Sequence, residues 1–163
     1  MSFKVKMDAS KIESVNEDLK KMGIRSKDFQ EAAPGVFKIL EEDVQYRFKT
    51  APTTVVGGES YGGIIWKPLT ATSLKMNPQR VGGQLLNDTG TLRESLKTTS
   101  PYSEQIIDKR KIRFGSKVPY AEKNQKSRPF VYWHAYLVEQ VATYLLEYIT
   151  VNKQSKSIIY QPK

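Results

Sequence analysis

The chain has 163 residues, 39% of them hydrophobic and 26% charged, which fits one globular domain and excludes a wholly disordered chain. It has no cysteine, which excludes disulfides, thiol nucleophiles and cysteine-based zinc sites, and no apolar stretch or leader that predicts a membrane span or a signal peptide. Its net charge of +9 is concentrated in residues 101–163, which carry 11 basic and 5 acidic side chains, and it favours a polyanionic partner such as nucleic acid.

The first part of the chain is predicted to be helical. A capping box at Ser10 and Glu13 opens an apolar stripe at helical spacing, and Gly23 is placed for a left-handed C-cap. A second helical pattern covers about residues 26–49 and is interrupted at Pro34, which a helix accepts only in its first turn. The acidic run 41–43 is interpreted as a solvated face of this helix.

Helical periodicity disappears from Ala51 to Gly83, where paired glycines and prolines interrupt a polar stretch. Loops of this length inside compact domains are usually binding or assembly segments. The glycine pairs do not form a phosphate-binding motif and no strand-then-helix pattern surrounds them, so the segment is predicted to be a flexible loop.

From residue 84 onward, the sequence predicts several short elements followed by one long helix. Thr91 and Glu94 form a second capping box before a short helix, with a turn at Gly90. Residues 105–114 predict two strands around a charged turn, and 132–150 predict a helix with an aromatic margin on its apolar face. The tail from Ser157 to Tyr160 is expected to add one last strand, against a neighbouring subunit in one interpretation.

The sequence contains no constellation that indicates catalysis. His134 is the single histidine, and helix packing or a local hydrogen bond explains it better than a metal or a reaction. Asp88 and Glu94 could in principle form an acid–base pair, but a turn and a helix cap account for them. We therefore predict no catalytic residue, no cofactor and no metal.

Four of the basic side chains in this part of the chain cluster in the predicted charged hairpin. The cluster consists of Lys109, Arg110, Lys111 and Arg113. These side chains could contact phosphates, and nearby aromatic residues could stack on bases. The same aromatic residues also suit a core or a subunit interface, so a basic nucleic-acid-binding module stays an alternative function.

Three segments, taken in order, resemble one known family. They are Tyr46-Arg-Phe48 with Trp66-Lys-Pro-Leu-Thr70; Leu86-Asn-Asp-Thr-Gly-Thr-Leu-Arg-Glu-Ser-Leu96; and Ile112-Arg-Phe-Gly-Ser116 with Pro119-Tyr-Ala121 and Arg128-Pro-Phe130. Their order and spacing resemble the tailed-phage virion morphogenesis proteins, which include the Mu-type morphogenesis protein and the P2-type tail completion protein. The resemblance covers about residues 36–150 and departs from the family pattern at 122–127, a segment that is short and basic here.

The resemblance implies a non-enzymatic subunit of an oligomeric ring, with a hexamer expected, in the neck of a virion assembled in the bacterial cytoplasm. Tail completion, tail termination and head closure all remain open. Its partners would be further copies of itself, tail terminator or tail tube proteins, and head-closure or adaptor proteins. The passing DNA would make nonspecific contacts, with the basic hairpin facing the lumen or a neighbouring ring. No membrane partner is expected.

Seven residues of the resembling segments are candidates for interface or assembly contacts: Trp66, Pro68, Leu69, Arg93, Tyr120, Arg128 and Phe130. Burial of Trp66 would anchor the long loop, and Arg128 could pair with a carboxylate across a subunit boundary. A role in the core of the subunit is the competing interpretation for all seven. A closed ring also needs two different complementary patches on each subunit, for which the loop 51–83 and the tail 151–163 are the candidates.

These observations predict one α+β domain over residues 1–163. A helical segment (1–50) and the long C-terminal helix would pack on a small, mostly antiparallel sheet. The loop (51–83) would precede an α+β core (84–150), and the tail or added strand (151–163) would end the chain.

Overall fold

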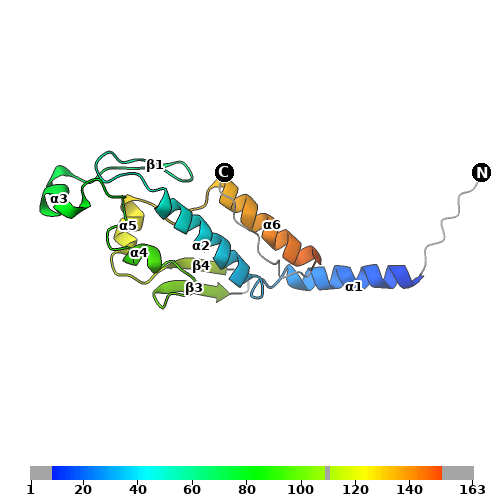
Figure 1. Cartoon of the computed structure of the whole chain (residues 1–163). Coiled ribbons are helices and arrows are strands. Elements are labelled where there is room, and N and C mark those ends of the chain that lie inside the picture. The colour runs from blue at the N-terminus through cyan, green and yellow to red at the C-terminus, as the bar shows by residue number, and fades with distance from the viewer. Residues whose placement is uncertain (1–8, 109–110, 152–163) are drawn as a thin grey trace, which may run out of the picture.

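The computed structural model describes residues 9–108 and 111–151, and it contains helices together with two small antiparallel sheets (Figure 1). The elements in chain order are α1 (Ala9–Arg25), α2 (Ala33–Lys49), β1 (Gly58–Ser60), β2 (Ile64–Trp66), α3 (Ala71–Met76), the 3₁₀ turn η1 (Pro78–Arg80), α4 (Thr91–Glu94), β3 (Ser103–Asp108), β4 (Lys111–Ser116), α5 (Ala121–Ser127) and α6 (Ala135–Val151). The α+β class is confirmed, and the strands form two separate hairpins, β1–β2 and β3–β4.

Pro34 lies in the first turn of α2, as the sequence predicts, where a backbone N–H has no partner within the helix. The helical pattern expected from about residue 26 is wrong at its start, because α2 begins only at Ala33. The predicted end of the preceding helix is wrong. Helix α1 continues through Gly23 to Arg25, and Gly23 does not adopt a positive φ. Ser26 takes over the capping role, since its N–H donates to the carbonyl of Met22 and its hydroxyl to the carbonyl of Gly23.

Two hydrophobic clusters lie along α2. In the first cluster, the first half of α2 packs on α6, beside which it runs in Figure 1. Its buried members are Ala32, Ala33, Val36, Phe37, Ile39, Leu40, Leu137, Val141, Tyr144 and Tyr148. In the second cluster, the last half of α2 packs on residues from β2, α4 and α5. Its buried members are Val44, Phe48, Ala51, Trp66, Leu85, Leu92, Leu96, Val118, Ala121 and Phe130.

The hairpin β3–β4 confirms the two strands expected around a charged turn. In the strand register, Gln105 lies opposite Phe114 and Ile107 lies opposite Ile112. Ile112 and Phe114 are two residues apart on β4, so they share one face of the hairpin, where they are half-buried and pack against the first cluster. Lys111 and Arg113 alternate with them and are exposed. None of the described helices is long and apolar enough to cross a membrane.

The segment 51–83, which we call the arm, is more ordered than the predicted loop, since it contains β1, β2, α3 and η1. Its two ends meet, because the N–H of Thr54 donates to the carbonyl of Gly83 at 2.8 Å and that of Leu85 to the carbonyl of Pro52 at 2.9 Å. Gly62, with φ +94, forms part of the tight turn between the strands, and a Cβ there would lie 2.3 Å from Tyr132 Oη. In Figure 1, α3 marks the end of the arm farthest from α1.

Two other local expectations change. The capping box at Thr91 does not form, because α4 starts at Thr91 itself and Gly90, with φ +75, precedes it as the N-cap. The turn at Gly90 nevertheless directs Leu92 and Leu96 into the second cluster, as expected. The basic segment 122–127, where the sequence departs from the family pattern, belongs to α5. The strand expected in the tail lies outside the described residues.

Candidate functional site

A buried group of charged side chains connects α2 to the segment that leads into α6. Arg47 Nη2 lies 2.7 Å from Asp43 Oδ2, and neither side chain is exposed. On the other side of the carboxylate, His134 Nε2 lies 2.7 Å from Asp43 Oδ1. The sequence spacing of four places Asp43 and Arg47 on one face of α2, and the chain returns 91 residues later to supply His134.

Arg47 also fixes two backbone segments. Its Nε donates to the carbonyl of Tyr61 at 2.9 Å, and its Nη1 donates to the carbonyl of Phe130. The ring of Tyr132 covers the guanidinium at 4.1 Å, and the Tyr132 hydroxyl donates to the same Tyr61 carbonyl at 2.7 Å. This network joins α2, the β1–β2 turn and residues 130–134, so its evident role is structural.

The network overturns the interpretation of the run 41–43 as a solvated face. Asp43 is fully buried, and Glu41 accepts hydrogen bonds from the N–H and the hydroxyl of Thr98, at 2.9 and 2.6 Å. His134 forms a hydrogen bond with Asp43, which lies 91 residues away, instead of the local one that the sequence suggested. Among the described residues, no three His, Cys, Asp or Glu side chains gather in an arrangement that could hold a metal ion.

Two of the candidate interface residues attach the arm to the rest of the subunit. Trp66 is completely buried, and its Nε1 donates to the carbonyl of Pro129 at 3.1 Å. Arg128 donates from Nε and Nη2 to the carbonyl of Lys67, at 3.0 and 2.9 Å, and from Nη2 to that of Pro68 at 3.1 Å. Both residues therefore make contacts within the subunit, and the partners of the Arg128 guanidinium are backbone carbonyls of the arm.

The other candidates are distributed between the core and the surface. Phe130 is buried against Phe48, with ring centroids 5.8 Å apart, and the side chain of Arg93 donates to Gln45 Oε1 at 2.8 Å. Leu69 is half-buried on the second cluster. Pro68 and Tyr120 are exposed and are the two candidates most available to a partner.

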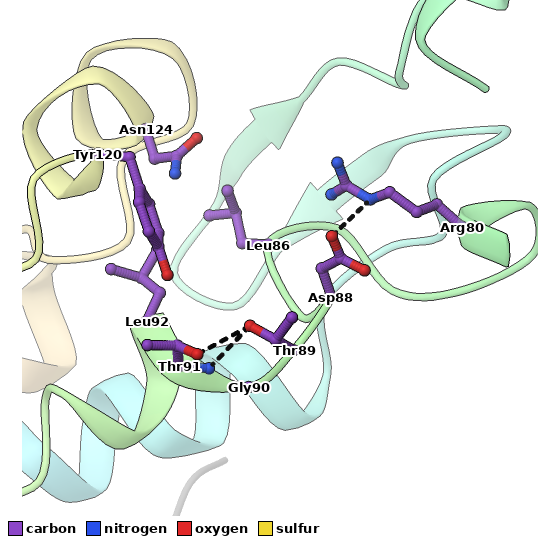
Figure 2. Close-up of a pocket in the computed structure, with 9 residues that line it drawn as sticks. All are labelled: Arg80, Leu86, Asp88, Thr89, Gly90, Thr91, Leu92, Tyr120 and Asn124. Carbon is purple, nitrogen blue, oxygen red and sulfur yellow. Dashed lines mark hydrogen bonds and ion pairs between the residues drawn. The ribbon is translucent and has the colours of Figure 1, made fainter. Parts of the chain in front are cut away.

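Tyr120 lines a pocket of about 300 Å³ between the end of the arm, the turn before α4, and α5 (Figure 2). Opposite it, Arg80 Nε lies 3.4 Å from Asp88 Oδ2, and the hydroxyls of Thr89 and Thr91 are 2.8 Å apart. Sequence reasoning missed this pocket, because its residues come from three separate segments and carry no shared motif. The pocket is a polar recess next to a candidate interface residue.

The basic cluster is only partly described. Lys111 and Arg113 are exposed on β4, whereas Lys109 and Arg110 lie outside the described residues. In the strand register, Lys111 lies opposite Asp108 and Arg113 lies opposite Ile106. The described part of the hairpin therefore mixes basic, acidic and apolar side chains.

The arm carries a set of exposed apolar side chains that the sequence did not single out. Ile65 is 73% exposed and Met76 is 76% exposed. The full set in this segment is Val55, Val56, Ile65, Met76 and Val81. Five large apolar side chains are therefore exposed on this one ordered segment.

No protein-family model matches the chain, and no curated protein or solved structure matches it either. The class of protein that the geometry defines therefore rests on the described residues alone. It is a small α+β protein with an anchored arm, exposed apolar side chains on that arm and a buried ion network that joins its segments.

Proposed function

We propose that this chain is a structural virion protein of a tailed phage or prophage, a ring subunit in the neck that completes the tail or joins it to the head. The support begins with the three segments that resemble virion morphogenesis proteins, because they contact one another in the fold. Trp66 of the first segment, Leu92 and Leu96 of the second and Phe130 of the third all belong to the second cluster. Packing of all three segments in one hydrophobic cluster is consistent with a structural role for the residues that carry the resemblance.

The observation that carries the proposal is the anchored arm with its exposed apolar side chains. A heterologous ring contact requires a preformed patch on one side of a subunit that fits a different patch on the next. The arm supports the proposal, since Trp66 and Arg128 attach it to the body while Ile65 and Met76 remain exposed. Its partner in the ring would be another copy of this chain, and a hexamer is the expected closed form.

The position in the neck brings further partners: tail terminator or tail tube proteins on one side, head-closure or adaptor proteins on the other, and the DNA that passes through. Within this class we place tail completion first and keep tail terminator and head-closure roles as alternatives.

Deletion of the gene tests the proposal in the phage. It should give filled heads and tails that do not join, or tails with an abnormal end, when lysates are viewed by electron microscopy. Wild-type protein supplied from a plasmid should restore joined particles, and a variant with Lys38→Ser, which alters an exposed position on α2, should do so equally well. Normal infectious particles from the deletion strain would refute the proposed function.

A basic nucleic-acid-binding module is the second candidate, and the exposure of Lys111 and Arg113 on β4 favours it. It predicts DNA binding that weakens steeply with added salt and with Lys109, Arg110 and Lys111 replaced by Ala. Replacement of three exposed lysines elsewhere, Lys20, Lys38 and Lys49, is the charge-matched control. Absence of binding at low salt would eliminate this function.

A further inference from the structure

Helix α6 has an apolar face that the described residues leave open. Leu137, Val141 and Tyr144 lie on its inner side and are buried against α2. On its outer side, Val138 is 48% exposed and Leu146 is 62% exposed, and the exposed Ala142 lies between them at a spacing of four in each direction. This spacing aligns the three side chains in one stripe along the helix. We call the stripe and the glutamates beside it the outer face of α6.

The charge of this face is opposite to that of the whole chain. Helix α6 contains no Lys or Arg, and its charged residues are Glu139 and Glu147, both exposed and on the side next to the stripe. Neither glutamate forms an ion pair with another described residue. In a chain of net charge +9, the outer face of α6 is thus an acidic and apolar surface.

Residues 152–163, which directly follow α6, have the complementary composition. They carry Lys153, Lys156 and Lys163 and no acidic residue, and their apolar side chains form the run 158–160. Ile159 is eight residues beyond Val151, so an extended chain can carry it up to roughly 26 Å from the helix end. Ala142 lies nine residues before Val151, about 13 Å back along the helix axis. The chain is long enough to reverse and reach the stripe.

We propose that residues 152–163 dock onto the outer face of α6 of their own chain. The run 158–160 covers Val138, Ala142 and Leu146, and the lysines lie beside Glu139 and Glu147. The same chain is the favoured occupant because a tether of a few residues gives the segment a millimolar effective concentration at its own helix, well above that of a segment from a second copy in dilute solution. The inference does not depend on the proposed virion role.

The absence of cysteine from the chain permits a direct test. The pair Ala142→Cys and Ile159→Cys places one thiol on the exposed stripe and one in the docking run. The matched control is Lys75→Cys with Ile159→Cys, which moves the first thiol to an exposed position on α3. Both proteins are oxidised at micromolar concentration, and the products are separated by non-reducing electrophoresis and weighed by mass spectrometry.

The expected result is a disulfide within the monomer that forms at least about tenfold faster in the first pair than in the control, since docking holds the two thiols together. Adding Glu139→Lys and Glu147→Lys should slow it about tenfold, and so should high salt. A covalent dimer as the main product would show that the occupant is the tail of a second copy and would overturn the proposal. Equal rates in the two pairs would also overturn it. Because the isolated protein is used, a failure here is distinct from a failure of the gene-deletion test.

Discussion

Arg47 is the residue whose contacts connect the largest number of separate segments in the buried ion network. A buried guanidinium loses several kcal/mol of hydration, and the loss is offset only if its donors find acceptors in good geometry. Here Asp43 and the carbonyls of Tyr61 and Phe130 supply those acceptors, and Tyr132 covers one face of the group. One side chain therefore contributes both to the position of the β1–β2 turn and to the entry into α6.

Replacement of Arg47 by Met should destabilise the protein by roughly 3–5 kcal/mol, because it takes the guanidinium away from the buried Asp43 carboxylate and removes the donors to two carbonyls. The free energy of unfolding in urea measures this loss. Lys49→Met, at an exposed position of the same helix, should change it by less than about 0.5 kcal/mol. A loss below about 1 kcal/mol for Arg47→Met would contradict the structural role given to the network.

Two tyrosines of α6 should make stability depend on alkaline pH. Burial raises the pKa of Tyr144, and burial together with the nearby Glu31 carboxylate raises the pKa of Tyr148 above the ordinary value. Below the unfolded pKa of about 10 both states keep the phenol proton, so these groups add no pH dependence there. Above it the unfolded chain loses the proton first, and stability falls as the pH rises toward the folded pKa.

Urea unfolding at pH 8 and at pH 10.5 measures this effect. The decrease between the two values should be smaller in the variants Tyr144→Phe and Tyr148→Phe than in the wild type. Tyr102→Phe, at an exposed position, is the control and should keep the wild-type decrease. An unchanged decrease in all three variants would show that neither buried phenol is linked to folding.

At the scale of elements, the contact between α2 and α6 depends on a glycine. Gly35 lies in the first turn of α2, and a Cβ there would meet Tyr144 Oη at 2.1 Å and Cζ at 2.2 Å. The ring of Tyr144 therefore occupies the space that any other residue at position 35 would need. Gly23 in α1 is different, since a Cβ there would meet nothing within 4 Å.

The two glycines give a matched pair of substitutions. Gly35→Ala should destabilise the protein by about 1–3 kcal/mol, because overpacking outweighs the gain in helix propensity. Gly23→Ala should leave stability unchanged or raise it by up to about 1 kcal/mol, since alanine is the better helix former. Thermal unfolding followed by circular dichroism compares them. Equal effects of the two substitutions would argue against the close approach of α6 to α2.

Arg128 attaches the arm to the rest of the chain through its hydrogen bonds to two arm carbonyls. Arg128→Ala removes the donors to the carbonyls of Lys67 and Pro68, so the arm should open locally while both hydrophobic clusters remain folded. We expect faster hydrogen exchange in residues 55–81 and little change in α2 and α6, measured by mass spectrometry. Lys126→Ala, two residues earlier at an exposed position of α5, should leave the exchange of the arm unchanged.

The elements that the sequence predicts well are those with a local pattern. Periodicity along one segment indicated α6 and the hairpin β3–β4 within a few residues, and α2 at its C-terminal end but not at its start. The strands β1 and β2 have three residues each, and the buried Trp66 that holds them finds its partner at Pro129, so no local pattern could indicate them. The pairing of Asp43 with His134 and the pocket at Tyr120 depend in the same way on residues far apart in the sequence.

At the scale of the whole molecule, the exposed residues of the arm should decide oligomeric state. If the arm forms the ring contact, native mass spectrometry should detect a closed oligomer of the wild-type protein, with six copies as the expected number. Ile65→Ser combined with Met76→Ser removes exposed apolar surface without touching a buried residue, so the subunit should fold and remain a monomer. Lys38→Ser should keep the wild-type mass. A folded wild-type monomer at high concentration would contradict the contact.

Helix α2 has a consequence for how the subunit responds to force. Its first half belongs to the first cluster and its second half to the second, and its 17 residues make a rod of about 25 Å. A packed helix is stiff along its axis, so a push on the base of the arm at Phe48 moves Val36 and the Tyr144 side chain that packs beside it. Helix α2 therefore couples the second cluster mechanically to the first cluster, and through the first cluster to α6.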